Sequence, residues 1–194
     1  MSALESAGPR PVLADLLPRA LVRDALLVMG AALLTALCAQ IVIPLPFSPV
    51  PLTGQTFAVL LTAAALGPLR GLAGQALYLA LGLVGLPFFQ GGESGWTYAT
   101  GATGGYLVGF LVAAVVVGAC SRRGLDRTPL GTLAAFALGT LTIYAFGAPW
   151  LASVTQMDLG GAFRAGVLPF LPGDALKAAL AAGLLPAAWR VARS

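Results

Sequence analysis

The chain of 194 residues has no histidine, only two cysteines and few charged residues, which make up 9% of it. The absence of histidine excludes serine–histidine and cysteine–histidine catalytic pairs as well as histidine metal ligands. Cys38 and Cys120 form neither a CxxC pair nor a zinc-binding pattern, so we interpret both as small apolar residues. We therefore expect none of these catalytic pairs and no metal site.

Apolar residues take the place of the missing charge. Hydrophobic residues make up 58% of the chain, and its mean hydropathy is +0.90. A soluble domain of this size has too little interior to hide so much apolar surface, and its charged fraction is normally about 25%. We interpret the chain as an all-α, multi-pass integral protein of the cell membrane. Because a helical span needs about 20 residues, there is room for roughly five to seven spans and for no separate soluble catalytic domain.

Charged residues and prolines divide the chain into one short segment and six helices. The segment at residues 12–22 is predicted to lie at the membrane interface, and a short amphipathic turn is expected near residues 160–163. Four prolines in residues 44–51 separate the first two helices, because proline disfavours a helical backbone. The predicted helices cover about residues 24–43, 53–66, 70–86, 103–119, 130–151 and 172–189. The domains are then an N-terminal cytoplasmic or interfacial segment (1–23), one six-helix transmembrane domain (24–189) and a cytoplasmic tail (190–194).

The lysines and arginines predict the orientation of these helices in the membrane. With six spans and a cytoplasmic N-terminus, nine of the eleven basic residues fall on the inner side; Arg164 lies outside and Lys177 within the last helix. This distribution accounts for the net charge of +4, so we expect no nucleic-acid partner. The outer loops then include the proline-rich stretch and the glycine- and aromatic-rich residues 87–105. Irregular backbone at membrane depth must be covered or line a cavity, which predicts a lidded pocket open to the outside.

Asp174 and Lys177 are the charged residues least expected in a membrane helix. Three positions apart, they share one helix face, and each would cost about 2.5–3.5 kcal/mol at the centre of a span. One interpretation is a self-neutralising structural pair, with Asp174 favoured at the helix N-terminus and Lys177 reaching the interface. The other, which we favour, is a polar clamp facing a solute.

Other candidate binding residues lie in and beside the outer loops. Gln55, at the start of a predicted helix, either caps that helix or offers both donors and acceptors to a cyclic amide or urea. Trp96 and Tyr98 belong either to an interfacial aromatic belt or to a lid that the neighbouring glycines allow to close. Gln90 supplies polar atoms in the same loop.

Ala32 and Ala36 form a small-xxx-small pair on the first predicted helix. Such spacing lets two helices approach closely. Internal packing is the default interpretation in a chain so rich in alanine, and a face that docks on a partner is the alternative.

Four segments in series resemble one known family: residues 49–56 (PVPLTGQT), 78–88 (YLALGLVGLPF), 103–110 (TGGYLVGF) and 169–177 (PFLPGDALK). In this order and spacing they are similar to BioY, the biotin-specific substrate-binding (S) components of energy-coupling factor (ECF) transporters. The resemblance covers about residues 25–188. It implies a six-helix membrane protein that captures biotin from outside and is not itself an enzyme, with no catalytic residues and no cofactor. It also implies partnership with a transmembrane coupling subunit and two cytoplasmic ATPase subunits, with the Ala32/Ala36 pair matching the family's docking motif.

The chemistry of biotin suits the candidate residues. The ligand has an uncharged ureido ring, an apolar sulfur ring and an anionic tail. We expect Asp174 to accept hydrogen bonds from the ureido N–H groups and Lys177 to meet the ureido carbonyl or the tail. Gln55 completes the polar set, and Trp96 and Tyr98 cover the apolar rings. Two alternatives stay open: a membrane scaffold or assembly subunit that binds no solute, and an S component for another vitamin.

Overall fold

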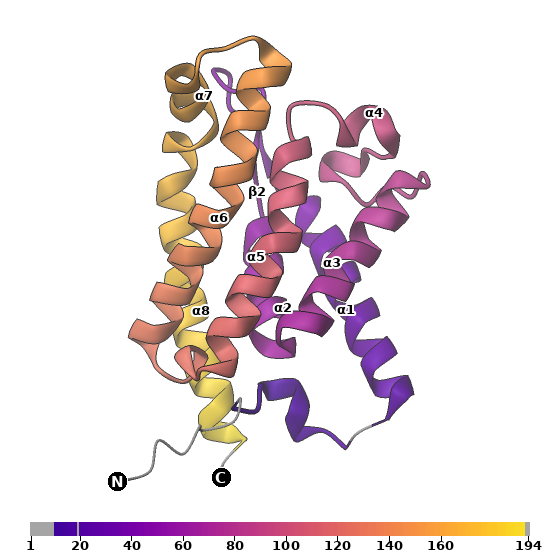
Figure 1. Ribbon diagram of the computed structural model, residues 1–194, viewed down its shortest axis with the longest axis vertical. Helices are drawn as coiled ribbons and strands as arrows, with labels where there is room; N and C mark the ends of the chain where they lie inside the picture. Colours follow the sequence, from indigo (N-terminus) through magenta and orange to yellow (C-terminus); the bar gives the residue numbers. More distant parts are fainter. Residues whose placement is uncertain (1–9, 19, 193–194) are drawn as a thin grey trace, which may run out of the picture.

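The computed structural model describes residues 10–18 and 20–192, which form a bundle of helices (Figure 1). Arg19, Arg193 and the outermost parts of the predicted terminal segments (residues 1–9 and 193–194) lie outside the described residues. The long helices are α1 (Leu21–Ala39), α2 (Gln55–Leu66), α3 (Pro68–Leu83), α5 (Gly104–Arg122), α6 (Pro129–Thr155) and α8 (Leu171–Val191). The shorter elements are η1 (Leu13–Leu16), β1 (Val42–Ile43), β2 (Leu52–Thr53), η2 (Gln90–Gly92), α4 (Gly95–Ala99), η3 (Leu125–Arg127), α7 (Leu159–Gly166) and η4 (Leu168–Phe170).

Within the part of the chain that the structure describes, four helical stretches are long and apolar enough to cross a membrane: Leu21–Ala39, Gly104–Arg122, Pro129–Thr155 and Leu159–Val191. The helix Gln55–Leu66 is apolar but shorter. Large apolar side chains such as Leu21, Leu37 and Leu141 are exposed on the outside of the bundle, as expected of helices that face lipid. The prediction of an all-helical membrane protein is confirmed at this level.

Four of the six predicted helices match the structure within a few residues, and two were predicted to end too late. The first was expected to continue to Ile43, but α1 ends at Ala39 because Val42 and Ile43 pair with Thr53 and Leu52 in an antiparallel hairpin. The third was expected to continue to residue 86, but α3 ends at Leu83, since the chain turns at Gly85 with φ +106°.

Most of the short elements gather at one end of the bundle, while η1 and η3 lie at the other. In Figure 1 the short helices α4 and α7 lie at the upper end, while α1 begins and α8 ends at the lower end. Successive long helices run in alternating directions, and α5 packs against α2, α3 and α6. Gly118 permits this central position, because a Cβ there would lie 2.4 Å from the backbone nitrogen of Pro68.

A charged cluster ties η1 to the lower end of the bundle. Asp15 accepts hydrogen bonds from Arg70 at 2.8 Å, from Arg122 at 2.7 Å and from the Val12 backbone N–H at 3.2 Å. Burial alone would raise the pKa of the Asp15 carboxyl, but these hydrogen bonds and the arginine charges outweigh it and lower the pKa below 3.8. Val12 is fully buried beside Leu66, so this part of the predicted interfacial segment also contributes to the core.

Candidate functional site

A cavity lies near the end of the bundle that carries α4 and α7. Its volume is about 490 Å³ when the open space at its mouth is included. The walls come from β2 and the residues before it, from the start of α2, from the loop around η2 and α4, and from α5, α6, η4 and α8. The lining residues are Val50, Pro51, Leu52, Thr53, Gln55, Thr56, Gln90, Tyr98, Thr103, Tyr106, Leu107, Phe110, Ile143, Tyr144, Phe170, Asp174 and Lys177.

Asp174 and Lys177 lie on one face of α8, as their spacing predicted, and they form an ion pair. The Lys177 Nζ lies 3.0 Å from the Asp174 Oδ1 and donates a second hydrogen bond to the Thr56 hydroxyl at 2.7 Å. The Tyr144 hydroxyl donates to the other carboxylate oxygen. The two charged side chains are only 9% and 16% exposed, so α2, α6 and α8 together enclose a nearly neutral group of polar atoms.

The sequence did not single out Thr56 or Tyr144 as partners of this pair. Both residues belong to predicted helices, where a hydroxyl is easily taken for an incidental surface group. Tyr144 carried a weak signal, because a phenol in the middle of an apolar helix needs a hydrogen-bond partner when it is buried. Tyr144 is 7% exposed, and Asp174 is that partner.

Gln55 joins β2, α2 and α3 rather than capping its helix. The Thr53 hydroxyl donates to the Gln55 Oε1 at 2.9 Å, and the Gln55 Nε2 donates to the Tyr78 hydroxyl. The helix cap itself is Gly54, which offers no side chain. Gln55 is 5% exposed and lines the cavity, so the structure rejects the capping interpretation and leaves its amide beside the candidate site.

The loop between α3 and α5 contributes Gln90 and Tyr98 to the cavity wall but not Trp96. Trp96 is 69% exposed and is absent from the lining, although it lies only two residues from Tyr98. The ring of Tyr98 stacks on Phe89 with the ring centres 4.9 Å apart. Burial raises the pKa of the Tyr98 phenol, so that group stays neutral at physiological pH.

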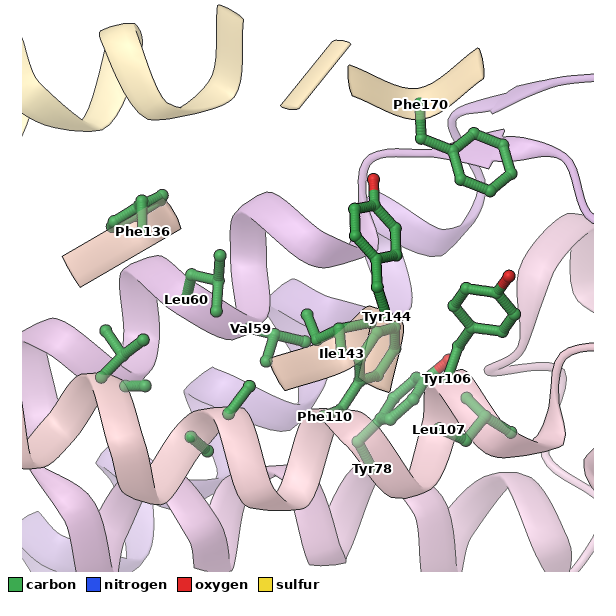
Figure 2. Packing of buried hydrophobic residues seen from close by; sticks show 14 of the residues in the cluster. Val59, Leu60, Tyr78, Tyr106, Leu107, Phe110, Phe136, Ile143, Tyr144 and Phe170 are labelled. Atoms are coloured by element: carbon green, nitrogen blue, oxygen red, sulfur yellow. The ribbon is translucent and has the colours of Figure 1, made fainter. Parts of the chain in front are cut away.

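Aromatic side chains from several helices form the apolar part of the wall. Figure 2 shows Tyr106, Tyr144 and Phe170 at one end of the buried cluster and Phe136 at the other. The Tyr106 hydroxyl donates to the backbone carbonyl of Gly166 at 2.8 Å, which fixes the end of α7 against α5. An apolar cavity with a few convergent polar groups is the usual form of a small-molecule site.

Ala32 and Ala36 lie in the interior of the bundle. Ala32 is fully buried and Ala36 is 8% exposed, on the side of α1 that packs against α2 and α3. Internal packing, the default interpretation, therefore describes them in this structure. The outer face of α1 presents larger side chains instead, among them Leu26, Met29 and Leu37.

A model of the BioY family matches residues 10–194 of the chain. A biotin transporter BioY from Rhizobium etli is 38% identical over 159 residues, which cover 78% of this chain and 84% of that protein. A probable biotin transporter BioY from Pyrococcus horikoshii is 38% identical over 148 residues, covering 76% and 85% respectively.

The fold is also that of a solved structure, the crystal structure of the S-component for biotin from an ECF-type ABC transporter. The TM-score is 0.77 with 24% sequence identity, over 91% of this chain and 96% of that one. The resemblance seen in the four sequence segments is thus confirmed over nearly the whole length of the chain. The chain belongs to the BioY family.

Proposed function

We propose that this chain binds biotin in the cavity and acts in biotin uptake as the substrate-binding component of an ECF-type transporter. The observation that carries the proposal is the Asp174–Lys177 pair, held by Thr56 and Tyr144 inside a wall that is otherwise mainly apolar and aromatic. The relatives support it, namely the biotin transporter from Rhizobium etli and the probable biotin transporter from Pyrococcus horikoshii. This role is that of a transport subunit and not of an enzyme.

The polar groups of the cavity match the polar groups of biotin. The Asp174 carboxylate accepts the ureido N–H groups, and the Lys177 ammonium donates to the ureido carbonyl or attracts the anionic tail. Gln55, next to Thr56 on α2, and Gln90 from the loop after α3 also line the cavity and complete the polar set. Tyr98 covers the apolar rings, while Trp96, which lies outside the lining, is left out of the proposed binding set.

All six long helices cross the membrane in this proposal, with both chain ends on the cytoplasmic side of the cell membrane. The ion pairs at the lower end of the bundle support the orientation, because Arg23, Arg70 and Arg122 gather there, away from the cavity. The proposed domain limits follow: a cytoplasmic or interfacial segment at 1–23, the transmembrane domain at 24–189 and a cytoplasmic tail at 190–194.

The proposed partners are a transmembrane coupling subunit and two cytoplasmic ATPase subunits, which supply the energy for uptake, together with the surrounding lipid. Docking through Ala32 and Ala36 requires both alanines to become accessible, because the structure buries them. That route therefore includes a movement of α1 away from α2 or α3. The exposed leucines on the outer face of α1 contact lipid in the unpartnered chain.

Calorimetry on the detergent-purified protein tests the proposal, with biotin as the ligand and thiamine and riboflavin as comparators. The proposal predicts saturable binding of biotin and none of the other two vitamins. Binding of thiamine or riboflavin instead assigns the cavity to another vitamin. No binding of any of them leaves the Asp174–Lys177 pair a structural lock and favours a scaffold subunit.

A further inference from the structure

Phe89 is a fully buried aromatic residue in the loop between α3 and α5. Residues 90–99 of this loop, which include η2 and α4, are called the lid below. Its ring contacts Tyr78 edge-on, with the ring centres 5.7 Å apart, and stacks on Tyr98 at 4.9 Å. Its backbone is held as well, because the Gln40 side chain donates to the Phe89 carbonyl at 3.2 Å. The Phe89 N–H in turn donates to the carbonyl of Glu93 at 3.0 Å. Both the ring and the backbone of this loop residue are therefore fixed.

Gly82 on α3 forms the socket for this ring. A Cβ at position 82 would lie 2.3 and 2.4 Å from two carbon atoms of the Phe89 ring, far inside van der Waals contact. By contrast, a Cβ at Gly30 on α1 or at Gly183 on α8 would meet no atom within 4 Å. Glycine weakens a helix, so its presence at position 82 is explained by the space that the ring occupies.

The chain that follows Phe89 turns at three glycines, which contribute no side chains to its packing. Gly91, Gly92 and Gly95 have φ values of +64°, +84° and +81°, and a Cβ on any of them would meet open space. Yet this loop supplies Gln90 and Tyr98 to the cavity wall. One of them directly follows Phe89 in sequence and the other stacks on its ring, so the position of both depends on where Phe89 sits.

We propose that Phe89, seated on Gly82, is a positioning residue that holds Gln90 and Tyr98 against the cavity and slows the escape of bound ligand. The inference rests on the proposed function, in that the ligand followed is biotin. Asp174 and Lys177 lie on α8, which Phe89 does not contact in the interactions described above. Releasing Phe89 therefore changes the lid and leaves the charged pair in place.

The test is a pulse-chase of labelled biotin from the purified protein. In Gly82→Ala we expect the dissociation rate to rise by roughly tenfold or more, with the association rate within about twofold of wild type, since overpacking at this socket displaces the ring. Phe89→Ala, which empties the socket, should give the same split between the two rates. In the Phe89→Ala background, adding Gly82→Ala should have no further effect, because the clash has been removed. Gly30→Ala is the matched control and should leave both rates unchanged.

A measurement without ligand tests the role of Phe89 and Gly82 independently of which solute the cavity binds. A spin label on Thr97→Cys, with Cys38 and Cys120 replaced by alanine, reports lid mobility directly. We expect Gly82→Ala and Phe89→Ala to increase that mobility and Gly30→Ala to leave it unchanged. Unaltered lid mobility and unaltered dissociation rates in both Gly82→Ala and Phe89→Ala would overturn the positioning role of Phe89. If the wild-type protein fails to bind biotin but the lid mobility still rises in both variants, the proposed function is overturned and the positioning role of Phe89 stands.

Discussion

Replacing Asp174 with asparagine removes one negative charge from the cavity while keeping the size of the side chain. In the wild-type protein the Asp174 carboxylate accepts hydrogen bonds from Lys177 at 3.0 Å and from Tyr144. In our account it also accepts a ureido N–H of biotin. Hydrogen bonds to a charged group contribute about 1.5–3 kcal/mol, and each 1.4 kcal/mol is a factor of ten in affinity. The variant should therefore bind biotin roughly 10- to 150-fold more weakly.

The same substitution should lower stability through Lys177. Its ammonium is 16% exposed and keeps the Thr56 hydroxyl as a partner at 2.7 Å, but it loses its counter-ion. Breaking one side of a buried pair costs about 3–5 kcal/mol, whereas replacing both charges by neutral groups is often close to neutral. The double variant Asp174→Asn/Lys177→Met should thus recover the thermal unfolding midpoint without recovering biotin affinity.

Titration calorimetry and thermal unfolding in the same detergent measure both effects. Asp158→Asn is the matched control, because Asp158 is an exposed carboxyl that caps α7 by accepting the Gly161 N–H, a bond that asparagine retains. It should leave affinity and stability close to wild type. An Asp174→Asn protein that binds biotin as tightly as wild type would refute the proposed role of the carboxylate. Affinity recovered together with stability in the double variant would show that Asp174 acts on the fold alone.

Two further predictions concern the lower end of the bundle and the lid. Asp15 has a lowered pKa in the fold, so its pairs with Arg70 and Arg122 stabilise the protein above pH 3.8 and are lost as the pH falls through the lower, folded-state value. Asp15→Asn should lower the free energy of unfolding by about 1.5–3 kcal/mol at neutral pH. In acid unfolding curves the variant should also lose less stability below about pH 4 than the wild type, and an unchanged curve would contradict this linkage. In the lid, Tyr98→Ala should weaken biotin binding by about tenfold, whereas Trp96→Ala, which changes an exposed side chain, should leave it within about twofold by calorimetry; equal losses would place Trp96 at the site after all.

The helices were predictable because charged residues and prolines mark their boundaries in the sequence. Arg70 and residues 121–128 interrupt the apolar stretches, and the proline-rich residues 44–51 exclude a continuous helix. The late predicted end of α1 has a non-local cause: Val42 and Ile43 are as apolar as the helix before them. Their pairing with β2 is decided by the return of the chain after the prolines.

The candidate site was predictable only in part, for similar reasons. Asp174 and Lys177 stand out because charge is rare in this chain, and their spacing places them on one helix face. Thr56 and Tyr144 reach them from α2 and α6, and contacts across helices leave no mark in sequence spacing. Trp96 was grouped with Tyr98 because both are aromatic residues of one loop. The short helix α4 nevertheless sends the first into the surroundings and the second into the cavity wall.

An experimental structure of the protein purified with biotin tests the central claim most directly. We predict ligand density in the cavity between α8 and the loop that carries Gln90 and Tyr98. The ureido N–H groups should lie within hydrogen-bonding distance of the Asp174 carboxylate, with Lys177 in contact with the ligand. Biotin bound elsewhere, with the Asp174–Lys177 pair closed on itself and the cavity free of ligand, would contradict it.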